Sequence, residues 1–511
     1  MTFVQERRRF LGAAMGALGA TFSTQAGSAT EPGAVAPGSI QSALGRLDEL
    51  VADIRARTGV PGLAVAVVQG PNKLYAKGFG VRNVRTREPV DADSVFQLAS
   101  MSKSVGATAV AREVGLGHVA WNQPMRELLP WFELSDPTAS RLVTIGDLYA
   151  HRSGLPDHIG DRLEDMGYGQ RQVLERLRHV ALEGFRTRYA YTNFGLTAAG
   201  VGVAGAAGVE WATLSEQAIY RPLGMSRTSS RFDDFLKRDN RVSAHQRLNG
   251  EWAVNTIRMP DAQAPAASVT SSVNDMARWL SMLLGEGALG GQRVVDAAAL
   301  AAALSPQIES VPASGGRSAS FYGFGFNVGV TSAGRRTMGH SGAFTLGAAT
   351  AFKVVPSTGL AMVVLTNGNP IGVPEILCAQ FFDLVEYGAI QRDYGALSEP
   401  FFAALNAPEG SLVGVSRPAA PVPAQSLVAY AGTYRNDYHG PVQVAVTGDA
   451  LLMTIWPAPL KLPLTHWDGN VFTFTLENEN AFPGTISKAT FAADRVTLEY
   501  YDKEGMGTFV R

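Results

Sequence analysis

Residues 62–68 have the sequence Gly-Leu-Ala-Val-Ala-Val-Val. This run, with the residues that follow it as far as Lys103, decides the fold. Its apolar, β-branched character predicts a strand, and a turn at Pro71-Asn72 predicts a hairpin with a second strand at residues 74–81. An Ala- and Val-rich stretch then predicts a helix that begins at Ser100-Met101-Ser102-Lys103. The chain therefore places a serine and a lysine one helical turn apart, soon after the first two strands.

Strand character returns late in the chain, after a long middle region that alternates helical segments with turns. The further predicted elements are strands at residues 323–330, 342–355 and 359–365, and helices at residues 41–57 and 374–387. Only one sheet assembled from both ends of this region would bury all the apolar faces together. The predicted fold class is α+β, with an antiparallel sheet flanked by helices and interrupted by a helical insertion.

The last part of the chain has a different composition. Residues 401–426 predict a linker, because the stretch from residue 405 is rich in Pro, Ala, Gly and Ser. Residues 427–511 contain short runs in which apolar and polar residues alternate, and turns separate these runs. This pattern predicts a small all-β domain. A barrel or a curled sheet is expected there, because either limits free strand edges.

Composition excludes several function classes. Hydrophobic residues make up 46% of the 511 residues, and charged residues 17%, as in folded proteins. The formal net charge of -1 gives no support to nucleic-acid binding, and the chain has no basic run beyond residues 7–9 and no zinc-finger spacing that would suggest it. No apolar stretch is long enough to predict a membrane span. The single cysteine, Cys378, lies in an apolar run and is expected to be a buried, inert thiol.

Residues 1–29 predict an export signal. A basic block, Arg7-Arg8-Arg9-Phe10-Leu11, runs into a short Ala- and Gly-rich stretch, and Ala26 and Ala29 are plausible cleavage points. Paired arginines followed by Phe-Leu resemble the twin-arginine type, so a periplasmic location is expected. The alternative is a disordered cytoplasmic leader.

Ser100 and Lys103 are the candidate nucleophile and its base. Residues i and i+3 lie on the same face of a helix, so the ammonium group can reach the hydroxyl. If the amine is shielded from water, its pKa falls and it can take the proton of the serine. Backbone N–H groups at a helix start favour developing negative charge. The alternative is a surface pair of Ser and Lys with no catalytic role.

Tyr191-Thr192-Asn193 adds a phenol and an amide two residues apart. In an extended loop both side chains point the same way. The phenol of Tyr191 can relay a proton between Ser100 and a leaving group. The amide of Asn193 can orient Lys103 or bind a substrate carbonyl. In isolation, a tyrosine of the core is the commoner explanation of such a residue.

His340-Ser341-Gly342 precedes Ala343 on a predicted strand. Gly342 would let a substrate approach the backbone closely. The N–H groups of Ala343 and Ser100 can form an oxyanion hole.

A rival interpretation makes Ser341 the nucleophile of an α/β-hydrolase elbow. That motif requires a strand, a sharp turn and a helix, whereas strands are predicted after Gly342. The later histidines, His439 and His466, also fall beyond the linker. A metal site is a further alternative, with His151, Asp157 and His158 as candidate ligands. The chain has neither His-Glu-x-x-His nor a Cys pair, so structural contacts are expected there, and neither a metal ion nor an organic cofactor.

Together these motifs resemble the penicillin-recognising serine hydrolases: class C β-lactamases, D-Ala-D-Ala carboxypeptidases, and related esterases and D-aminopeptidases. The resemblance covers residues 40–400, the expected hydrolase domain. It includes His-Arg-Ser-Gly-Leu-Pro at the end of residues 143–156, Pro-Leu-Gly-Met at 222–225 and Ser-Ser-Val-Asn-Asp-Met-Ala at 271–277. Residues 427–511, with Tyr-Ala-Gly-Thr-Tyr from Tyr430, resemble the lipocalin-like domain often fused to such hydrolases.

The resemblance implies a β-lactamase/transpeptidase-like fold and a role for each motif. Ser100 would be the acylated nucleophile, with Lys103 and Tyr191 as its proton-handling partners. Asn193 would position the substrate and the lysine. Substrate would dock against the strand edge that carries His340, Ser341 and Gly342.

One departure bears on the substrate. β-Lactamases and carboxypeptidases of this group usually carry Lys-Thr-Gly where this chain has His340-Ser341-Gly342. A histidine near neutral pH is mostly uncharged, so it is a poor partner for the carboxylate of penicillin. Among the activities of the family, the resemblance then implies an acyl-enzyme peptidase or amidase on short D-residue peptides, such as peptidoglycan fragments or linearised microcystin. The alternatives are a carboxylesterase, a β-lactamase, and a non-catalytic binding or assembly protein.

Overall fold

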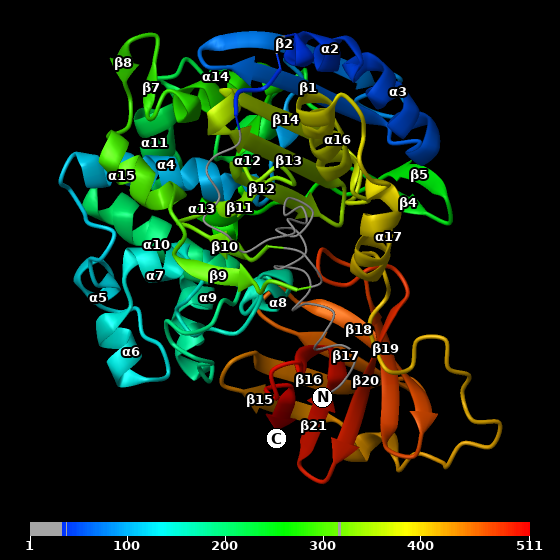
Figure 1. The fold of residues 1–511 in the computed structure, drawn as a ribbon. Coiled ribbons are helices and arrows are strands. Elements are labelled where there is room, and N and C mark those ends of the chain that lie inside the picture. The colour runs from blue at the N-terminus through cyan, green and yellow to red at the C-terminus, as the bar shows by residue number, and fades with distance from the viewer. Residues whose placement is uncertain (1–32, 37, 315–317) are drawn as a thin grey trace.

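The computed structural model describes residues 33–36, 38–314 and 318–511. The predicted export signal at residues 1–29 lies outside this range. The described chain forms an α+β part built on one large sheet and a closed β-barrel at its C-terminal side (Figure 1). Both were predicted, and the fold class is confirmed.

The large sheet has eight antiparallel strands in the order β2-β1-β14-β13-β12-β11-β10-β9. Their bounds are β1 Gly62–Gln69, β2 Asn72–Gly80, β9 Ile308–Val311, β10 Ser320–Tyr322, β11 Asn327–Val330, β12 Arg336–Phe344, β13 Ala348–Val355 and β14 Leu360–Thr366. The early hairpin pairs directly with the late strands, since Leu63 of β1 lies opposite Thr366 of β14. The two ends of the region thus meet in one sheet, as the apolar pattern predicts.

Three of the predicted strands and helices differ from the structure. The strand predicted at residues 323–330 begins only at Asn327, as β11. The strand predicted at residues 342–355 is two strands, because β12 and β13 form a hairpin with a turn at residues 345–347. Gly347 has a φ of 141°, and a Cβ there would lie 2.4 Å from the backbone nitrogen of His245. The flanking strand ends are both buried and apolar, so the hydrophobic pattern alone does not reveal the turn. The helix predicted at residues 41–57 is likewise divided, into α2 Ser39–Gly45 and α3 Leu47–Thr58.

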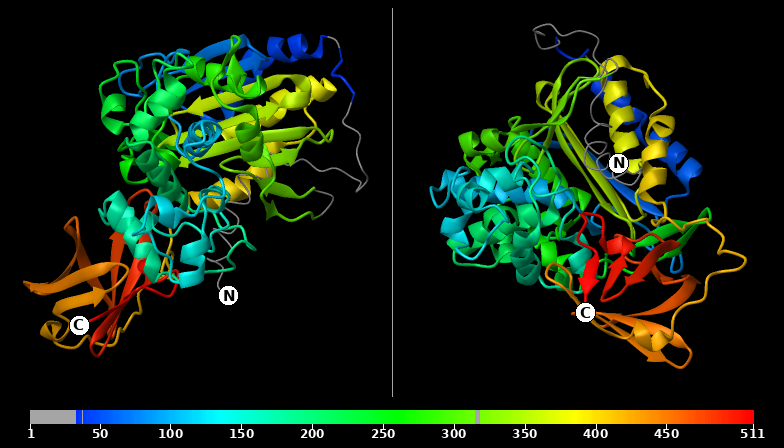
Figure 2. Two further views of the ribbon diagram at one scale, coloured as in Figure 1. Left: turned by 90° about the vertical axis from the view of Figure 1, so that its left-hand side faces the viewer. Right: turned by 90° about the horizontal axis from the view of Figure 1, so that it is seen from below.

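Helices cover both faces of the sheet (Figure 2). On one face, α14 Val273–Leu284 packs on β1 and β14, and α4 Met101–Gly115 packs on β12. On the other face, α16 Val373–Tyr387 packs on β13 and β14, and α3 packs on α16. Because successive side chains of a strand point to opposite faces of the sheet, β1 contributes residues to both cores. Ala64, Ala66 and Val68 join the first core, and Leu63, Val65 and Val67 join the second.

The remaining elements surround this sheet. The helices are α5 Met125–Leu128, α6 Pro137–Leu142, α7 Ile145–Tyr149, α8 Asp161–Asp165, α9 Gln170–Arg176, α10 Asn193–Ala206, α11 Trp211–Ser215, α12 Phe232–Leu236, α13 Ala264–Ala267, α15 Ala297–Leu304 and α17 Tyr394–Leu405. Short strands pair as β3 Phe96–Gln97 with β6 Thr270–Ser271, β4 His245–Leu248 with β5 Glu251–Val254, and β7 Ala288–Leu289 with β8 Gln292–Arg293.

The barrel is a meander in which each strand pairs with the next. Its strands are β15 Gly432–Asn436, β16 Gly440–Thr447, β17 Ala450–Ile455, β18 Leu460–Asp468, β19 Val471–Leu476, β20 Thr485–Ala492, β21 Arg495–Leu498 and β22 Thr508–Val510. The last strand closes the barrel, because Val510 pairs with Arg435 of the first. Closure leaves no free edge, which is the physical reason for expecting a barrel. The likeness to lipocalins stays a prediction.

The linker predicted at residues 401–426 begins later than expected, because helix α17 continues to Leu405. Residues 406–426 connect the two parts without a helix or a strand. They are nonetheless tied to the barrel by backbone hydrogen bonds. Ile486 N donates to Glu409 O at 3.0 Å, and Gly469 N donates to Val422 O at 2.8 Å. The connection is therefore held in place along its length.

The barrel lies against the segment around α8 (Figure 1). The Tyr168 hydroxyl donates to His439 O at 2.9 Å, and Gly160 N donates to the Tyr438 hydroxyl at 3.0 Å. Arg162 forms an ion pair with Glu409 at 2.8 Å. Within the described ranges, none of the helices combines the length and hydropathy needed to cross a membrane.

Replacing Phe352 by Ala is expected to lower the free energy of unfolding by about 3–5 kcal/mol. Its ring is buried in β13 and meets Trp279 of α14 edge-on, at 5.0 Å between centroids. Denaturant unfolding measures the loss. Leu116→Ala, at a side chain that is 54% exposed, serves as the control and should cost less than about 0.5 kcal/mol. Equal losses in the two variants would contradict the described core.

Candidate active site

Ser100 immediately precedes the first turn of α4 and follows a strained residue, Ala99. Ala99 has a φ of 48°, in the left-handed region that non-glycine residues seldom occupy. Such strain persists only where the surroundings enforce it, and it concentrates at functional sites. The side chain of Met101 and the body of α4 are buried, which anchors the start of the helix.

Lys103 lies one turn further along α4 and is fully buried. Its Nζ donates to Ser100 Oγ at 3.0 Å, to Asn193 Oδ1 at 2.6 Å and to the backbone oxygen of Ala266 at 3.1 Å. Three acceptors at these distances match the three donors of an ammonium group. The geometry brings together the serine and the lysine that the spacing predicts.

Burial lowers the pKa of Lys103 to about 7, with the negative charge of Asp161 opposing this shift and the positive charge of Arg258 adding to it. Near neutral pH a large share of these amines is therefore uncharged. An uncharged amine 3.0 Å from a hydroxyl can accept its proton.

Tyr191 is also buried at this point. Lys103 Nζ lies 4.6 Å from the centre of its ring. Burial raises the pKa of the Tyr191 phenol, and the nearby Ser100 hydroxyl only partly opposes this. The phenol thus keeps its proton at neutral pH. Its hydroxyl has no well-formed hydrogen bond among the described residues, so it is available to a reacting group.

Asn193 is the first residue of α10 and connects Lys103 with an acidic residue. Its Oδ1 accepts from Lys103, and its Nδ2 donates to Asp161 Oδ2 at 2.9 Å. The same carboxylate oxygen lies 2.8 Å from Nδ1 of His158. These two bonds fix the orientation of the amide, so that its oxygen faces the lysine.

The sequence does not predict Asp161 as a site residue, and it offers His158 only as a candidate metal ligand. Burial raises the pKa of Asp161, but hydrogen bonds from His158 and Asn193 outweigh it, so the net shift is downward and the carboxylate stays charged. The spacing of three between His158 and Asp161 is a sequence signal for a local pair. The link to Asn193, 32 residues away, has no such signal.

Gly342 shows how closely β12 approaches Ser100, the candidate nucleophile. A Cβ at this position would lie 2.1 Å from Leu98 O and 3.0 Å from the backbone nitrogen of Ser100. Only glycine permits that approach. β12 pairs with β11 only as far as Gly339, so residues 340–344 form an edge that β11 does not cover. The oxyanion hole from the N–H groups of Ser100 and Ala343 stays a prediction.

His340 is buried in β12 and lies near this site. Its Nε2 accepts from the Tyr322 hydroxyl at 2.8 Å, and its Nδ1 donates to Ser341 O at 2.6 Å, a tautomer assigned from these partners. Burial, helped by the charge of Lys103, lowers the pKa of His340 to about 3. The imidazole is therefore neutral, and the strand carries no permanent cation at this position.

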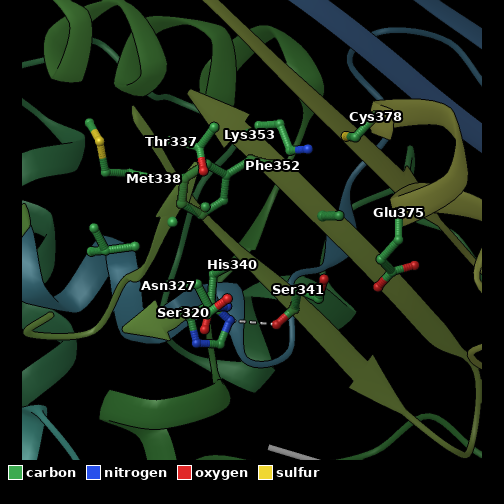
Figure 3. A pocket seen from close by; sticks show the side chains of 14 residues that line it. Ser320, Asn327, Thr337, Met338, His340, Ser341, Phe352, Lys353, Glu375 and Cys378 are labelled. Atoms are coloured by element: carbon green, nitrogen blue, oxygen red, sulfur yellow. Dashed lines mark hydrogen bonds between the residues drawn. The ribbon is translucent and has the colours of Figure 1, made fainter. Parts of the chain in front are cut away.

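Ser341 points the other way (Figure 3). Its side chain lies on the side of Glu375 in α16. Burial raises the pKa of the Glu375 carboxyl, and a hydrogen bond with the Ser341 hydroxyl partly opposes that shift. Any contact between Ser341 and a substrate at the edge would therefore come from its backbone. Ser341 also lies in the middle of β12, which is followed by β13. The strand–turn–helix geometry of a nucleophile elbow is absent at this residue.

A small cavity of about 50 Å³ lies behind the site, between the sheet and α16 (Figure 3). It shares His340 and Ser341 with the strand edge but is not lined by Ser100, Lys103 or Tyr191. The arrangement around Ser100, and not this cavity, therefore identifies the candidate active site.

The three residues weighed as metal ligands have structural partners. His151 Nδ1 accepts from Thr192 N at 3.1 Å, and Asp157 Oδ1 accepts from Tyr191 N at 2.9 Å. His158 pairs with Asp161. In the part of the chain that the structure describes, no group of three or more His, Cys, Asp or Glu side chains is arranged to hold a metal ion. Cys378 is buried, as predicted.

Residues 47–381, more than half of the chain, match the family described as Beta-lactamase. The chain belongs to the Beta-lactamase family. Residues 416–502 match a second family, described as a domain of unknown function, DUF3471.

Named relatives of this Beta-lactamase-family protein differ in length. It is 29% identical over 324 residues to a penicillin-binding protein 4 of Amycolatopsis lactamdurans, covering 62% of this chain and 83% of the relative. It is 27% identical over 249 residues to an unguisins hydrolase of Aspergillus campestris, covering 46% of each chain. The chain thus spans about half the length of the unguisins hydrolase. An octameric penicillin-binding protein homologue from Pyrococcus abyssi shares the fold, with a TM-score of 0.58, 20% identity, and coverage of 92% of this chain and 100% of that one.

The reactivity of Ser100 is expected to rise with pH through a midpoint near 7, because Lys103 accepts a proton only when it is uncharged. The rate of labelling by a fluorophosphonate between about pH 5 and pH 9 measures this, with mass spectrometry to locate the label. Ser104→Ala is the matched control, since its buried hydroxyl donates only to Gly325 O, at 2.6 Å. A rate that does not change across this range would contradict the role of the lysine.

Proposed function

We propose that this protein is a serine hydrolase that forms an acyl-enzyme on Ser100 and cleaves amide bonds in short peptides that contain D-residues. The observation that carries the reaction type is the fully buried Lys103, 3.0 Å from the Ser100 hydroxyl. The membership in the Beta-lactamase family supports the same chemistry.

In the proposed mechanism, Ser100 Oγ attacks the substrate carbonyl while Lys103 accepts its proton. The tetrahedral oxygen takes hydrogen bonds from the N–H groups of Ser100 and Ala343, each worth roughly 10²–10³ in rate at such sites. The Lys103 ammonium then returns this proton through the Tyr191 phenol, which gives its own proton to the leaving amine and takes that of Lys103, so the phenol stays protonated. Water next attacks the acyl-enzyme and loses a proton to Lys103, which passes it to Ser100 Oγ as the ester bond breaks. This releases the acid and restores the serine.

The strand edge favours peptides over penicillins. A neutral His340 offers no ion pair to the carboxylate of a β-lactam, and charge-assisted bonds are roughly twice as strong as neutral ones. The preference for D-residues rests on resemblance to peptidases of this family. One relative is named for hydrolysing unguisins, and another is named a penicillin-binding protein. Export to the periplasm also stays a prediction, resting on Arg7-Arg8 and the Ala- and Gly-rich stretch after them.

Ser100→Ala is expected to lower hydrolysis of every accepted substrate by at least about 10³-fold, because the covalent route is lost. Steady-state assays with a D-Ala-containing peptide and a chromogenic ester measure the effect. Ser104→Ala, the same change one turn along α4, is the control for folding and should retain activity. Unchanged turnover in Ser100→Ala, with loss in Ser341→Ala, would support the elbow interpretation instead.

A substrate panel is expected to rank D-residue dipeptides first, p-nitrophenyl esters second and benzylpenicillin last. The values of kcat/KM for the dipeptides, tested as C-terminal amides that carry no carboxylate, should exceed that for penicillin by at least about tenfold, since a neutral His340 offers no ion pair to the penicillin carboxylate. Matched L-configured dipeptides test the stereochemical preference. A ranking led by esters would identify a carboxylesterase, and one led by penicillin a β-lactamase. A protein inert to all of them and to fluorophosphonate would be a binding or assembly protein.

A further inference from the structure

Glu479 reaches from the barrel into the hydrolase part of the molecule. It lies between β19 and β20 and is buried. Its Oε1 accepts from Thr345 N at 2.9 Å and its Oε2 from Leu346 N at 3.3 Å. The Thr345 hydroxyl in turn donates to Glu479 O at 2.5 Å. The barrel thus holds the turn that ends β12, the strand that carries Gly342.

The same carboxylate neutralises a buried arginine. Arg258 Nη1 lies 3.1 Å from Glu479 Oε1, and Arg258 Nη2 lies 2.5 Å from Glu164 Oε2. The guanidinium also sits 4.9 Å from the centre of the Phe344 ring, at the end of β12. All three charged side chains are about nine-tenths buried. An ion network of this kind is strongly destabilised when one partner is removed, because the remaining charge stays buried.

This network borders the candidate nucleophile through α8. Helix α8 carries Asp161 at its first residue and Asp165 at its last. Asp161 binds Asn193, the acceptor of Lys103. Asp165 Oδ2 accepts from Asn480 of the barrel, the residue after Glu479, at 2.8 Å. The barrel therefore touches both β12 and α8, the two elements that flank Ser100 and Lys103.

We propose that Glu479 is a positioning residue of the active site, supplied by the barrel, which fixes the end of β12 and the orientation of Arg258. The proposal rests on the proposed function only in requiring that Ser100 reacts. It gives the barrel a part in the chemistry that neither family description states.

Several charged and titratable groups face Lys103 or Arg258. Lys103 interacts with Asp161 and Arg258, and also with the neutral imidazoles of His151 and His340. Arg258 interacts with the carboxyl groups of Glu164, Glu479, Asp165 and Asp161. Burial raises the pKa of Glu479, and the charge of Arg258 together with the N–H groups of Thr345 and Leu346 opposes that shift. Loss of the carboxylate in Glu479→Gln leaves the positive charge of Arg258 less balanced, which disfavours the ammonium form of Lys103. The rise of Ser100 labelling with pH, called the acid limb below, should then shift to lower pH.

The experiment measures the pH dependence of fluorophosphonate labelling of the full chain in four forms: the parent, Glu479→Gln, Glu479→Asp and Tyr168→Phe. Tyr168→Phe removes another bond between the barrel and the hydrolase part, to His439 O, without changing a charge. Glu479→Asp keeps the charge but shortens the reach to the turn.

Glu479→Gln is expected to move the acid limb down by about half a pH unit and to reduce the plateau rate about tenfold. Glu479→Asp should keep the limb and lose plateau rate, and Tyr168→Phe should match the parent in both. A parent-like limb and plateau in Glu479→Gln would overturn the proposal, as would the same change in Tyr168→Phe. If Glu479→Gln does not fold, the test rests on Glu479→Asp. The proposal is overturned if the plateau labelling rate of Glu479→Asp is no lower than that of Tyr168→Phe. A parent that is not labelled at any pH would instead overturn the proposed function, and the role of Glu479 with it.

Discussion

The removal of Lys103 from water is the constraint on which the rest of the structure depends. A buried ammonium is costly unless acceptors surround it, and here a hydroxyl, an amide oxygen and a backbone carbonyl do so. Each acceptor comes from a different segment, so α4, α10 and α13 must meet at one point. Asp161 keeps the amide oriented toward the lysine from a fourth segment. The same burial that forces this convergence makes the amine a base near neutral pH.

The sheet contributes by bringing a strand unusually close to the helix start. Gly342 is the position where β12 passes Leu98 and Ser100, and a side chain there has no room. Because β12 is paired fully with β13 but only partly with β11, one stretch of its backbone is left for other partners. The fold thus places the candidate nucleophile and an extended strand edge side by side, with the neutral imidazole of His340 at that edge.

The sequence allowed most of this arrangement to be predicted, for local reasons. Strand β1 and the start of α4 were evident because their periodicity and spacing are contained within a few residues. The turn at residues 345–347 was missed because Phe344 and Ala348 are both apolar and buried. Arg258 and Glu479 were missed for a different reason: a buried ion pair between residues so far apart in the chain has no local pattern. The orientation of Ser341 depends on which face of β12 meets α16, which becomes known only with the sheet order.

The closure of the barrel by its last strand has a consequence for how the two parts of the chain depend on each other. Val510 of β22 pairs with Arg435 of β15, so the cylinder closes only when all the strands between them are in place. Glu479 lies between β19 and β20 of that unit, 3.1 Å from Arg258 of the hydrolase part. Docking of the closed barrel therefore completes the charge pairing of Arg258, which links the folding of the C-terminal part to that of the hydrolase part.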